Sequence, residues 1–152
     1  MGPWVSRLQS QRFGTTVLVV DASALATALG DDGSDGDLAR ARLRDQQLFA
    51  PELIDLEVVS VLRRQLSVGA LDMRRAQLAL EDLLGLPIER APHASLLVRC
   101  WELRDNLTVY DAAYVALAEA LGTELLTADT RLASAPGLRC PVELLHPRGA
   151  GA

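Results

Sequence analysis

The sequence lacks any surplus of basic side chains, and this limits how it could meet a nucleic acid. It contains no lysine, its 15 basic residues are all arginine, and its 20 acidic residues leave a net charge of −5 at neutral pH. This balance argues against a protein that coats DNA or RNA through a broad basic surface. It still allows a nucleic-acid enzyme whose acidic residues are concentrated in one metal-loaded pocket.

Cysteine and histidine are also scarce. Only Cys100 and Cys140 occur, without Cys-x-x-Cys spacing, so we expect reduced thiols in a cytosolic protein. His93 and His146 are isolated in the sequence, and we interpret both as solvent-exposed or loop residues. There is no Cys/His pattern for zinc and no phosphate-binding P-loop.

Long apolar runs are missing as well. No segment reaches the length of a membrane span, and the first 16 residues lack the apolar stretch of a secretory signal. We therefore expect no membrane attachment and a cytoplasmic location. A length of 152 residues with 49% hydrophobic composition predicts one globular domain at 16–146. A disordered extension over 1–15 and a flexible tail over 147–152 are expected to flank it.

The most informative stretch is Val17–Leu25. Its first four residues are aliphatic, which is typical of a strand buried on both faces within a parallel sheet. The run ends at Asp21, and Ala22–Leu29 then has the composition of a helix, with Ser23 near its start. Asp21 is thus predicted at the carboxyl end of a central strand, where open α/β sheets bind their ligands.

Strand and helix patterns alternate along the rest of the chain. Further strands are predicted at Leu48–Ala50, Leu86–Glu89, Glu124–Ala128 and Val142–Leu145. Helices are predicted from Asp37 to Asp45, from Pro51 to Leu66, from a cap at Asp72 to Leu84, from Pro92 to Leu103, over Val109–Leu121 and at Thr130–Ala133. Pro87 places its strand at a sheet edge. The alternation predicts a three-layer αβα fold with a four- to five-stranded, mostly parallel sheet.

Three aspartates recur at the ends of these elements. Asp21 follows the first strand, Asp129 follows the fourth, and Asp111 lies in the first turn of the 109–121 helix. Each has an ordinary structural explanation, because Thr108 to Asp111 fits a capping box and Asp129 can cap the turn behind it. Ser23 could support Asp21 by a hydrogen bond or could simply begin a helix.

Glu57 is harder to explain as a surface residue. On a helical wheel it lies among Leu53, Ile54 and Val61, on the apolar side of its helix. An unpaired buried carboxylate costs roughly several kcal/mol unless a cation or a partner compensates it. Arg64 shares this face and is one possible partner; a cation held jointly with other acids is the alternative.

Taken together, these segments resemble a known family. The segments are Val-Asp-Ala-Ser-Ala-Leu at 20–25, Pro51 with Glu57-Val58 and Leu62-Arg63, Tyr110–Ala118, and Leu126–Ala133. They are similar to the PIN-domain ribonucleases, most closely to the VapC toxins of bacterial toxin–antitoxin pairs. The resemblance extends over about Val17 to Leu145, and the segments of Asp111 and Asp129 are its most specific parts.

The resemblance implies a PIN-like fold whose clustered acids hold Mg²⁺ or Mn²⁺ and cleave single-stranded or looped RNA. It also implies a homodimer that is silenced by a co-encoded antitoxin. Asp21, Asp111 and Asp129 would be metal ligands, directly or through water, and Glu57 a further ligand or the orienter of a water. Hard divalent cations prefer carboxylate oxygens and can activate water and neutralise phosphate charge.

One position departs from the family pattern. Many relatives carry another acid two residues after the one matching Asp129, whereas this chain has Arg131. A fourth metal contact or a second metal is therefore in question. The departure keeps a second interpretation open, a catalytically weak PIN fold that binds RNA or a protein partner. Arginines would hold the RNA, and the candidates are Arg40, Arg42 and Arg44, or Arg63 and Arg64.

Two other classes with an acid after the first strand fit less well. A haloacid-dehalogenase-like phosphatase needs a second aspartate two residues after the first, where Ser23 stands. A receiver domain needs paired acids at the first strand and a lone aspartate after the third, and neither feature is a good match.

Overall fold

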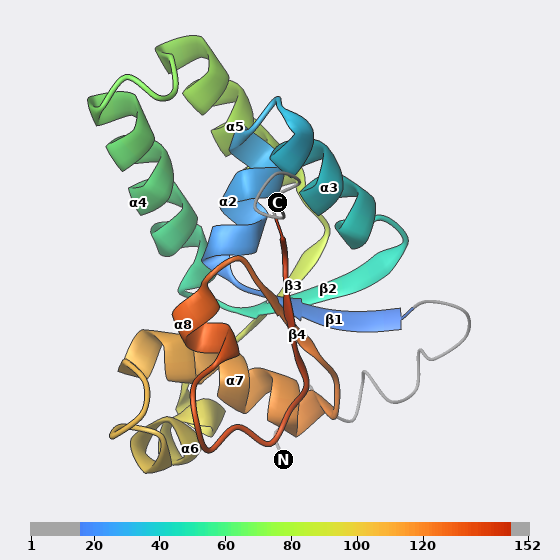
Figure 1. Ribbon diagram of the computed structural model, residues 1–152, viewed down its shortest axis with the longest axis vertical. Coiled ribbons are helices and arrows are strands. Elements are labelled where there is room, and N and C mark those ends of the chain that lie inside the picture. The colour runs from blue at the N-terminus through green and yellow to red at the C-terminus, as the bar shows by residue number, and fades with distance from the viewer. Residues whose placement is uncertain (1–15, 147–152) are drawn as a thin grey trace, which may run out of the picture.

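Parallel strands form the sheet at the centre of the computed structural model, which describes residues 16–146 (Figure 1). They are β1 (Thr16–Val20), β2 (Gln46–Pro51), β3 (Ile88–Ala91), β4 (Leu125–Thr127) and β5 (Val142–Leu144), in the order β3-β2-β1-β4-β5. Every neighbouring pair is parallel. The extension predicted over 1–15 and the tail predicted over 147–152 lie outside the described residues.

Helices cover both faces of this sheet. They are α2 (Ala22–Gly30), α3 (Ser34–Leu43), α4 (Ile54–Ser67), α5 (Met73–Gly85), the 3₁₀ turn η1 (Ala94–Leu96), α6 (Leu97–Glu102), α7 (Val109–Leu121) and α8 (Thr130–Ala133). Figure 1 shows α2 to α5 on one side of the sheet and α6 and α7 on the other. The predicted three-layer αβα fold is confirmed.

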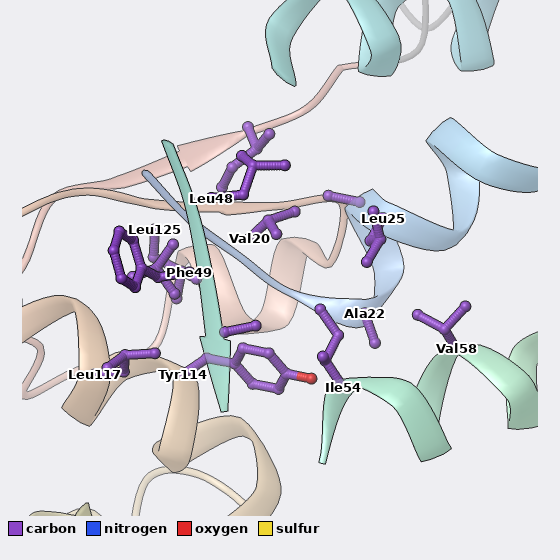
Figure 2. Packing of buried hydrophobic residues seen from close by; sticks show 14 of the residues in the cluster. Val20, Ala22, Leu25, Leu48, Phe49, Ile54, Val58, Tyr114, Leu117 and Leu125 are labelled. Carbon is purple, nitrogen blue, oxygen red and sulfur yellow. The ribbon is translucent and has the colours of Figure 1, made fainter. Parts of the chain in front are cut away.

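β1 lies at the centre of the sheet, and four of its five residues are aliphatic. Leu18, Val19 and Val20 are fully buried, and the strand pairs with β2 on one side and β4 on the other. Burying a side chain of this kind stabilises the fold by about 1.5–3 kcal/mol. Figure 2 shows Phe49 and Leu125, from the two neighbouring strands, in the same apolar cluster.

α7 lies close against the sheet because it presents small side chains to it. Every residue of 112–118 is buried, and four of these seven are alanine. Both predicted ends are confirmed: Thr108 caps the start, and Gly122 ends the helix with φ of 63°, a left-handed conformation that favours glycine. The helix therefore holds Asp111 and Tyr114 in a fixed relation to the sheet.

The sequence context of Pro51 predicted that this residue begins a helix, and this prediction is wrong. Pro51 ends β2 opposite Ala91 of β3, and α4 begins at Ile54. The ladder tolerates the missing N–H at this position because the next residue, Glu52, donates to the Ala91 carbonyl at 3.0 Å. Pairing with β3 therefore outweighs the tendency of proline to open a helix.

Three other elements also have shifted boundaries. The polar 30–37 loop is shorter than predicted, because α3 begins at Ser34 and not after Asp37. Gly36 permits this, since a Cβ at that position would lie 1.8 Å from the Asp31 carbonyl oxygen. β3 is an edge strand, as predicted, but it lies two residues later than expected, and the following helix begins as η1 at Ala94 instead of at Pro92.

Candidate active site

The carboxyl ends of β1 and β4 open into a cleft of about 340 Å³. The two strand ends meet there because parallel strands direct their carboxyl ends to one edge of the sheet. Residues of α2, α4, α7 and α8 complete the walls of the cleft. Its lining is rich in charged and hydroxyl groups and consists of Asp21, Ala22, Ser23, Glu57, Ser60, Val61, Arg64, Asp111, Tyr114, Asp129 and Arg131. All four acids predicted from the sequence therefore line the same cleft.

Asp21 is the most deeply buried of these acids, with 5% of its surface exposed. Its Oδ1 accepts from Ser23 Oγ at 2.7 Å and from the Ala24 backbone N–H at 2.9 Å, and its Oδ2 accepts from Thr127 Oγ1. The bond from Ala24 makes Asp21 the N-cap of α2. Both roles considered for Ser23 are therefore combined, since it lies at the helix start and also supports Asp21.

Thr127, which the sequence analysis missed, connects two of the acids. Its side chain is fully buried at the end of β4, and its Oγ1 also accepts from the Asp129 backbone N–H at 3.0 Å. Ser23 Oγ accepts in turn from the Ala128 N–H at 2.9 Å. These bonds tie the end of β1 to the end of β4. A hydroxyl residue two positions before Asp129 in a buried strand was the available signal.

Glu57 is half-buried, and its partner is a tyrosine. Its Oε1 accepts from the Tyr114 hydroxyl at 2.7 Å. The Tyr114 ring lies in the core, and Figure 2 shows its hydroxyl directed toward α4 near Ile54. No ion pair within residues 16–146 joins Glu57 to Arg64, so the salt bridge considered for this pair is not formed. Tyr114 lies one helical turn after Asp111, a spacing that could have identified it.

Asp111 and Asp129 also have local structural roles. The Asp111 backbone N–H donates to Thr108 Oγ1 at 3.1 Å, which forms one half of the predicted capping box. Asp129 caps α8, because its Oδ1 accepts from the Arg131 backbone N–H at 2.9 Å. The Arg131 guanidinium is 3.4 Å from Oδ2 of Asp129. These structural roles leave both carboxylates on the lining of the cleft.

Burial and like charge raise the pKa of three of the four acids. For Asp21 burial is the largest cause and outweighs its hydrogen bonds, and the charge of Asp111 adds to it. Burial also raises the pKa of Glu57, assisted by Asp111 and Asp21, and the pKa of Asp111, assisted by Asp129. Burial acts in the same direction on Asp129, but hydrogen bonds and charge from Arg131 outweigh it and lower that pKa. Bringing these acids together therefore has an electrostatic cost that a cation would relieve.

The donor set fits a hard divalent cation. It consists of carboxylate and hydroxyl oxygens, the ligands that Mg²⁺ and Mn²⁺ favour over sulfur and imidazole. Within residues 16–146, no three Asp, Glu, His or Cys side chains are already arranged to hold a metal ion. The acids thus line one cleft without forming a closed cage, which suits an ion that retains several of its waters.

Two of the arginines predicted as RNA contacts have other partners. Arg42 Nε and Nη2 bind Glu143 at 2.7–3.0 Å, and Nη2 also binds Glu124. Arg40 donates to the carbonyls of Ala28 and Asp31 at 2.8 and 2.7 Å. Both guanidinium groups therefore hold the fold together, which contradicts their predicted role as RNA contacts. Arg44, Arg63 and Arg64 are exposed, and of these three only Arg64 lines the cleft, so it alone stays a candidate for RNA contact at the site.

His93 lies in the loop between β3 and η1, which agrees with the predicted loop position, but it is not fully exposed to solvent. It is half-buried, and its Nε2 accepts from the Leu53 backbone N–H at 3.0 Å. This bond attaches the segment after β3 to the start of α4, the helix that carries Glu57. His146 is exposed, and Cys100 and Cys140 are both free thiols, as predicted.

A larger hollow of about 560 Å³ lies elsewhere, beside α2, α3 and α5. Its lining includes Leu25, Leu48 and Leu86, and none of the four site acids. The acidic cleft is therefore the stronger candidate for chemistry. Of the helices in the described part of the chain, none combines the length and the apolar character that crossing a membrane requires.

Comparison with known proteins identifies similar chains. The family described as PIN domain matches residues 18–138. Ribonuclease VapC1 of Mycobacterium tuberculosis is 44% identical over 129 residues, which cover 84% of this chain and 97% of that protein. Two crystal structures share the fold. VapC20 of Mycobacterium tuberculosis has a TM-score of 0.60 and 17% identity, and the match covers 76% of this chain and 92% of that chain. VapBC2 from Rickettsia felis has a TM-score of 0.63 and 14% identity, and the match covers 86% of this chain and 100% of that chain.

Proposed function

The chain belongs to the PIN-domain family, and from this premise we propose that it is a metal-dependent endoribonuclease, the toxin of a toxin–antitoxin pair. The observation that carries the proposal is the convergence of Asp21, Glu57, Asp111 and Asp129, from four separate elements, on one cleft. Ribonuclease VapC1, which is 44% identical, supports the reaction class. The substrate is RNA, and the reaction is hydrolysis of a phosphodiester bond.

The cofactor we propose is Mg²⁺ or Mn²⁺, held by Asp21, Asp111 and Asp129 directly or through water, with Glu57 as a further ligand. A bound divalent cation supplies activation of the attacking water and neutralisation of charge on the phosphate. Asp21 is well suited as a ligand, because its three hydrogen bonds orient the carboxylate and a carboxylate can accept about four bonds.

Glu57 is proposed to act within the same cleft as a ligand or as an acceptor that orients the attacking water. Tyr114 fixes one of its oxygens at 2.7 Å, and the buried ring leaves this tyrosine little freedom to move. Asp111, half-buried in the first turn of α7, completes the acidic lining of the cleft.

Cleavage of a generic single-stranded RNA by the purified protein tests this proposal. We expect cleavage with Mg²⁺ or Mn²⁺, products with a 5′-phosphate, and no cleavage in excess chelator. Asp111→Asn should abolish activity, whereas Asp105→Asn, which changes an exposed acid outside the cleft lining, should retain it. Activity that survives the chelator, or that both variants lose equally, would contradict the mechanism.

A second candidate function is a PIN fold that binds RNA or a protein partner without cleaving. The observation that favours it is Arg131, a cation beside Asp129 where many relatives carry an acid. RNA binding without metal-dependent cleavage at any divalent cation concentration would favour this candidate over the nuclease.

We further propose a cognate antitoxin and a homodimer, acting in the cytoplasm. Exposed aliphatic side chains support a protein-binding role for α4 and α5: Leu56 on α4, Val68 directly after α4 and Leu84 on α5 are 76–79% exposed. Co-expression with the small protein encoded next to this gene should yield a stable, inactive complex. Analytical ultracentrifugation of the purified chain would measure whether it sediments as the proposed homodimer or as a monomer.

A further inference from the structure

Two arginines line the acidic cleft from two different elements. Arg64 lies on α4, two helical turns after Glu57 and thus roughly 10 Å further along the helix axis. Arg131 lies on α8, two residues after Asp129. The cleft therefore contains cationic groups in addition to its four carboxylates.

Five of the ten other arginines in the described chain are held in ion pairs. Those with partly buried side chains are Arg42, Arg75, Arg90 and Arg99, which are 18–28% exposed and bind carboxylates at 3.1 Å or less. Such groups stabilise the fold and are not available to a ligand without breaking these pairs.

The cleft arginines differ from this group. Among the ion pairs found within residues 16–146, none includes Arg64. The side chain of Arg131 is 91% exposed, and its one ion pair, with Asp129, is long at 3.4 Å. Asp129 is already fixed by the Arg131 backbone N–H, so the guanidinium is not required to hold it. Both guanidinium groups can therefore turn to a ligand at little structural cost.

The polyanionic character of RNA identifies that ligand. A cleft of four carboxylates repels a phosphodiester chain, and a metal ion offsets this only at the bond where it is bound. Guanidinium groups suit phosphates because their planar donors can bind two oxygens at once. We propose that Arg64 and Arg131 form a phosphate clamp, which binds the backbone phosphates of single-stranded RNA beside the scissile bond. The clamp rests on the proposed ribonuclease function.

The clamp also gives a role to the departure at position 131. An acid there would add a metal ligand, whereas Arg131 adds a contact to the substrate. Arg131 would bind the phosphate nearest to Asp129, and Arg64 a phosphate further along the strand. Both are substrate-binding residues in this proposal and take no part in moving protons.

RNA binding in chelator tests the clamp without cleavage. The anisotropy of a short labelled single-stranded oligoribonucleotide is measured over a range of salt concentrations, for the full chain. Each phosphate contact contributes about 0.7 to the slope of log affinity against log salt. We expect Arg64→Gln and Arg131→Gln each to reduce the slope by about 0.7, and the double variant to reduce it by about 1.4.

Arg63→Gln is the matched control, because Arg63 is an exposed neighbour of Arg64 on α4 that does not line the cleft. It should leave the slope unchanged. An equal reduction in Arg63→Gln and Arg64→Gln would indicate diffuse attraction and would overturn the clamp, as would wild-type slopes in all variants. Loss of binding to the antitoxin with normal RNA binding would assign both arginines to the protein partner instead.

Arg131→Asp separates the clamp from a missing metal ligand. With Mg²⁺, the clamp predicts that Arg64→Gln and Arg131→Gln have a higher KM for RNA than the wild type and nearly the same kcat. Arg131→Asp should have a KM higher than that of Arg131→Gln. A gain of activity in Arg131→Asp would overturn the clamp. If the wild type cleaves no RNA in any divalent cation, the ribonuclease function itself is refuted. The salt dependence of RNA binding is measured without cleavage, so it tests only the clamp.

Discussion

The hydrogen bond from Tyr114 to Glu57 offers a direct test of how the acidic cleft is supported. Tyr114→Phe removes only the hydroxyl, so the ring, which is 1% exposed, keeps its packing in the core. Glu57 Oε1 then loses its donor at 2.7 Å. Hydrogen bonds to charged groups contribute about 1.5–3 kcal/mol, and because Glu57 stays half-exposed to water we expect the lower end.

The loss should depend on pH in a defined direction. The bond favours the ionised form of Glu57 and lowers its pKa, although burial raises that pKa overall. Tyr114→Phe therefore raises the pKa further, and its destabilisation is complete where Glu57 is ionised. As the pH falls through the raised pKa of Glu57, the carboxyl takes up a proton and the destabilisation decreases.

Thermal and urea denaturation at about pH 8 and about pH 5 measure this difference. In chelator at the higher pH we expect Tm to fall by about 3–5 °C, and by less at the lower pH. Tyr110→Phe is the matched control, because Tyr110 lies on the same helix and is 66% exposed. Equal losses at both pH values, or an equal loss in Tyr110→Phe, would show that the hydroxyl does not act through an ionised Glu57.

Three further predictions concern the same cleft. Metal-free Asp111→Asn should be more stable than the wild type at neutral pH, because it removes a charge that raises the pKa of Asp21 and Glu57. Mg²⁺ should raise the Tm of the wild type more than the Tm of the variant. A variant that is less stable than the wild type, with an equal Tm shift in Mg²⁺, would refute a shared metal site. Thr127→Val should lower the free energy of unfolding by about 1–3 kcal/mol in urea titrations, because Asp21 loses a donor and the Asp129 N–H loses its acceptor; an unchanged midpoint would contradict this. In chelator, the three acids with raised pKa bind more protons in the folded state than in the unfolded state. Their contribution to stability should therefore decline as pH rises from about 4 toward neutrality, and Mg²⁺ should reverse the decline. Denaturation midpoints measured across this pH range, with and without Mg²⁺, test this expectation.

Local signals in the sequence were sufficient for the elements that position the site. The aliphatic run before Asp21 predicted β1, because a short run of β-branched and aliphatic residues is typical of a strand covered on both faces; three of its four side chains are buried and Val17 is partly buried. Thr108 and Gly122 predicted both ends of α7, since capping depends on residues within one turn of each helix end. The candidate acids followed from these elements, because parallel strands bring their carboxyl ends to one edge.

Boundaries that depend on distant segments were predicted less well. Pro51 ends β2 because β3 pairs with it, and nothing within a few residues of Pro51 indicates that pairing. The role of Arg42 was missed for the same reason, since its partners Glu124 and Glu143 lie about eighty and one hundred residues away in the chain.

The sequence by itself determined the alternation of strands and helices, and the acids that end them, because periodicity, capping and strand burial are properties of short segments. Only the tertiary structure decided which groups those acids meet. Glu57 pairs with Tyr114 and not with Arg64, although Arg64 is close in sequence, because α7 presents its buried hydroxyl across the sheet edge to α4. The partners of a half-buried charge depend on how separate elements pack, and packing is settled by the whole core at once.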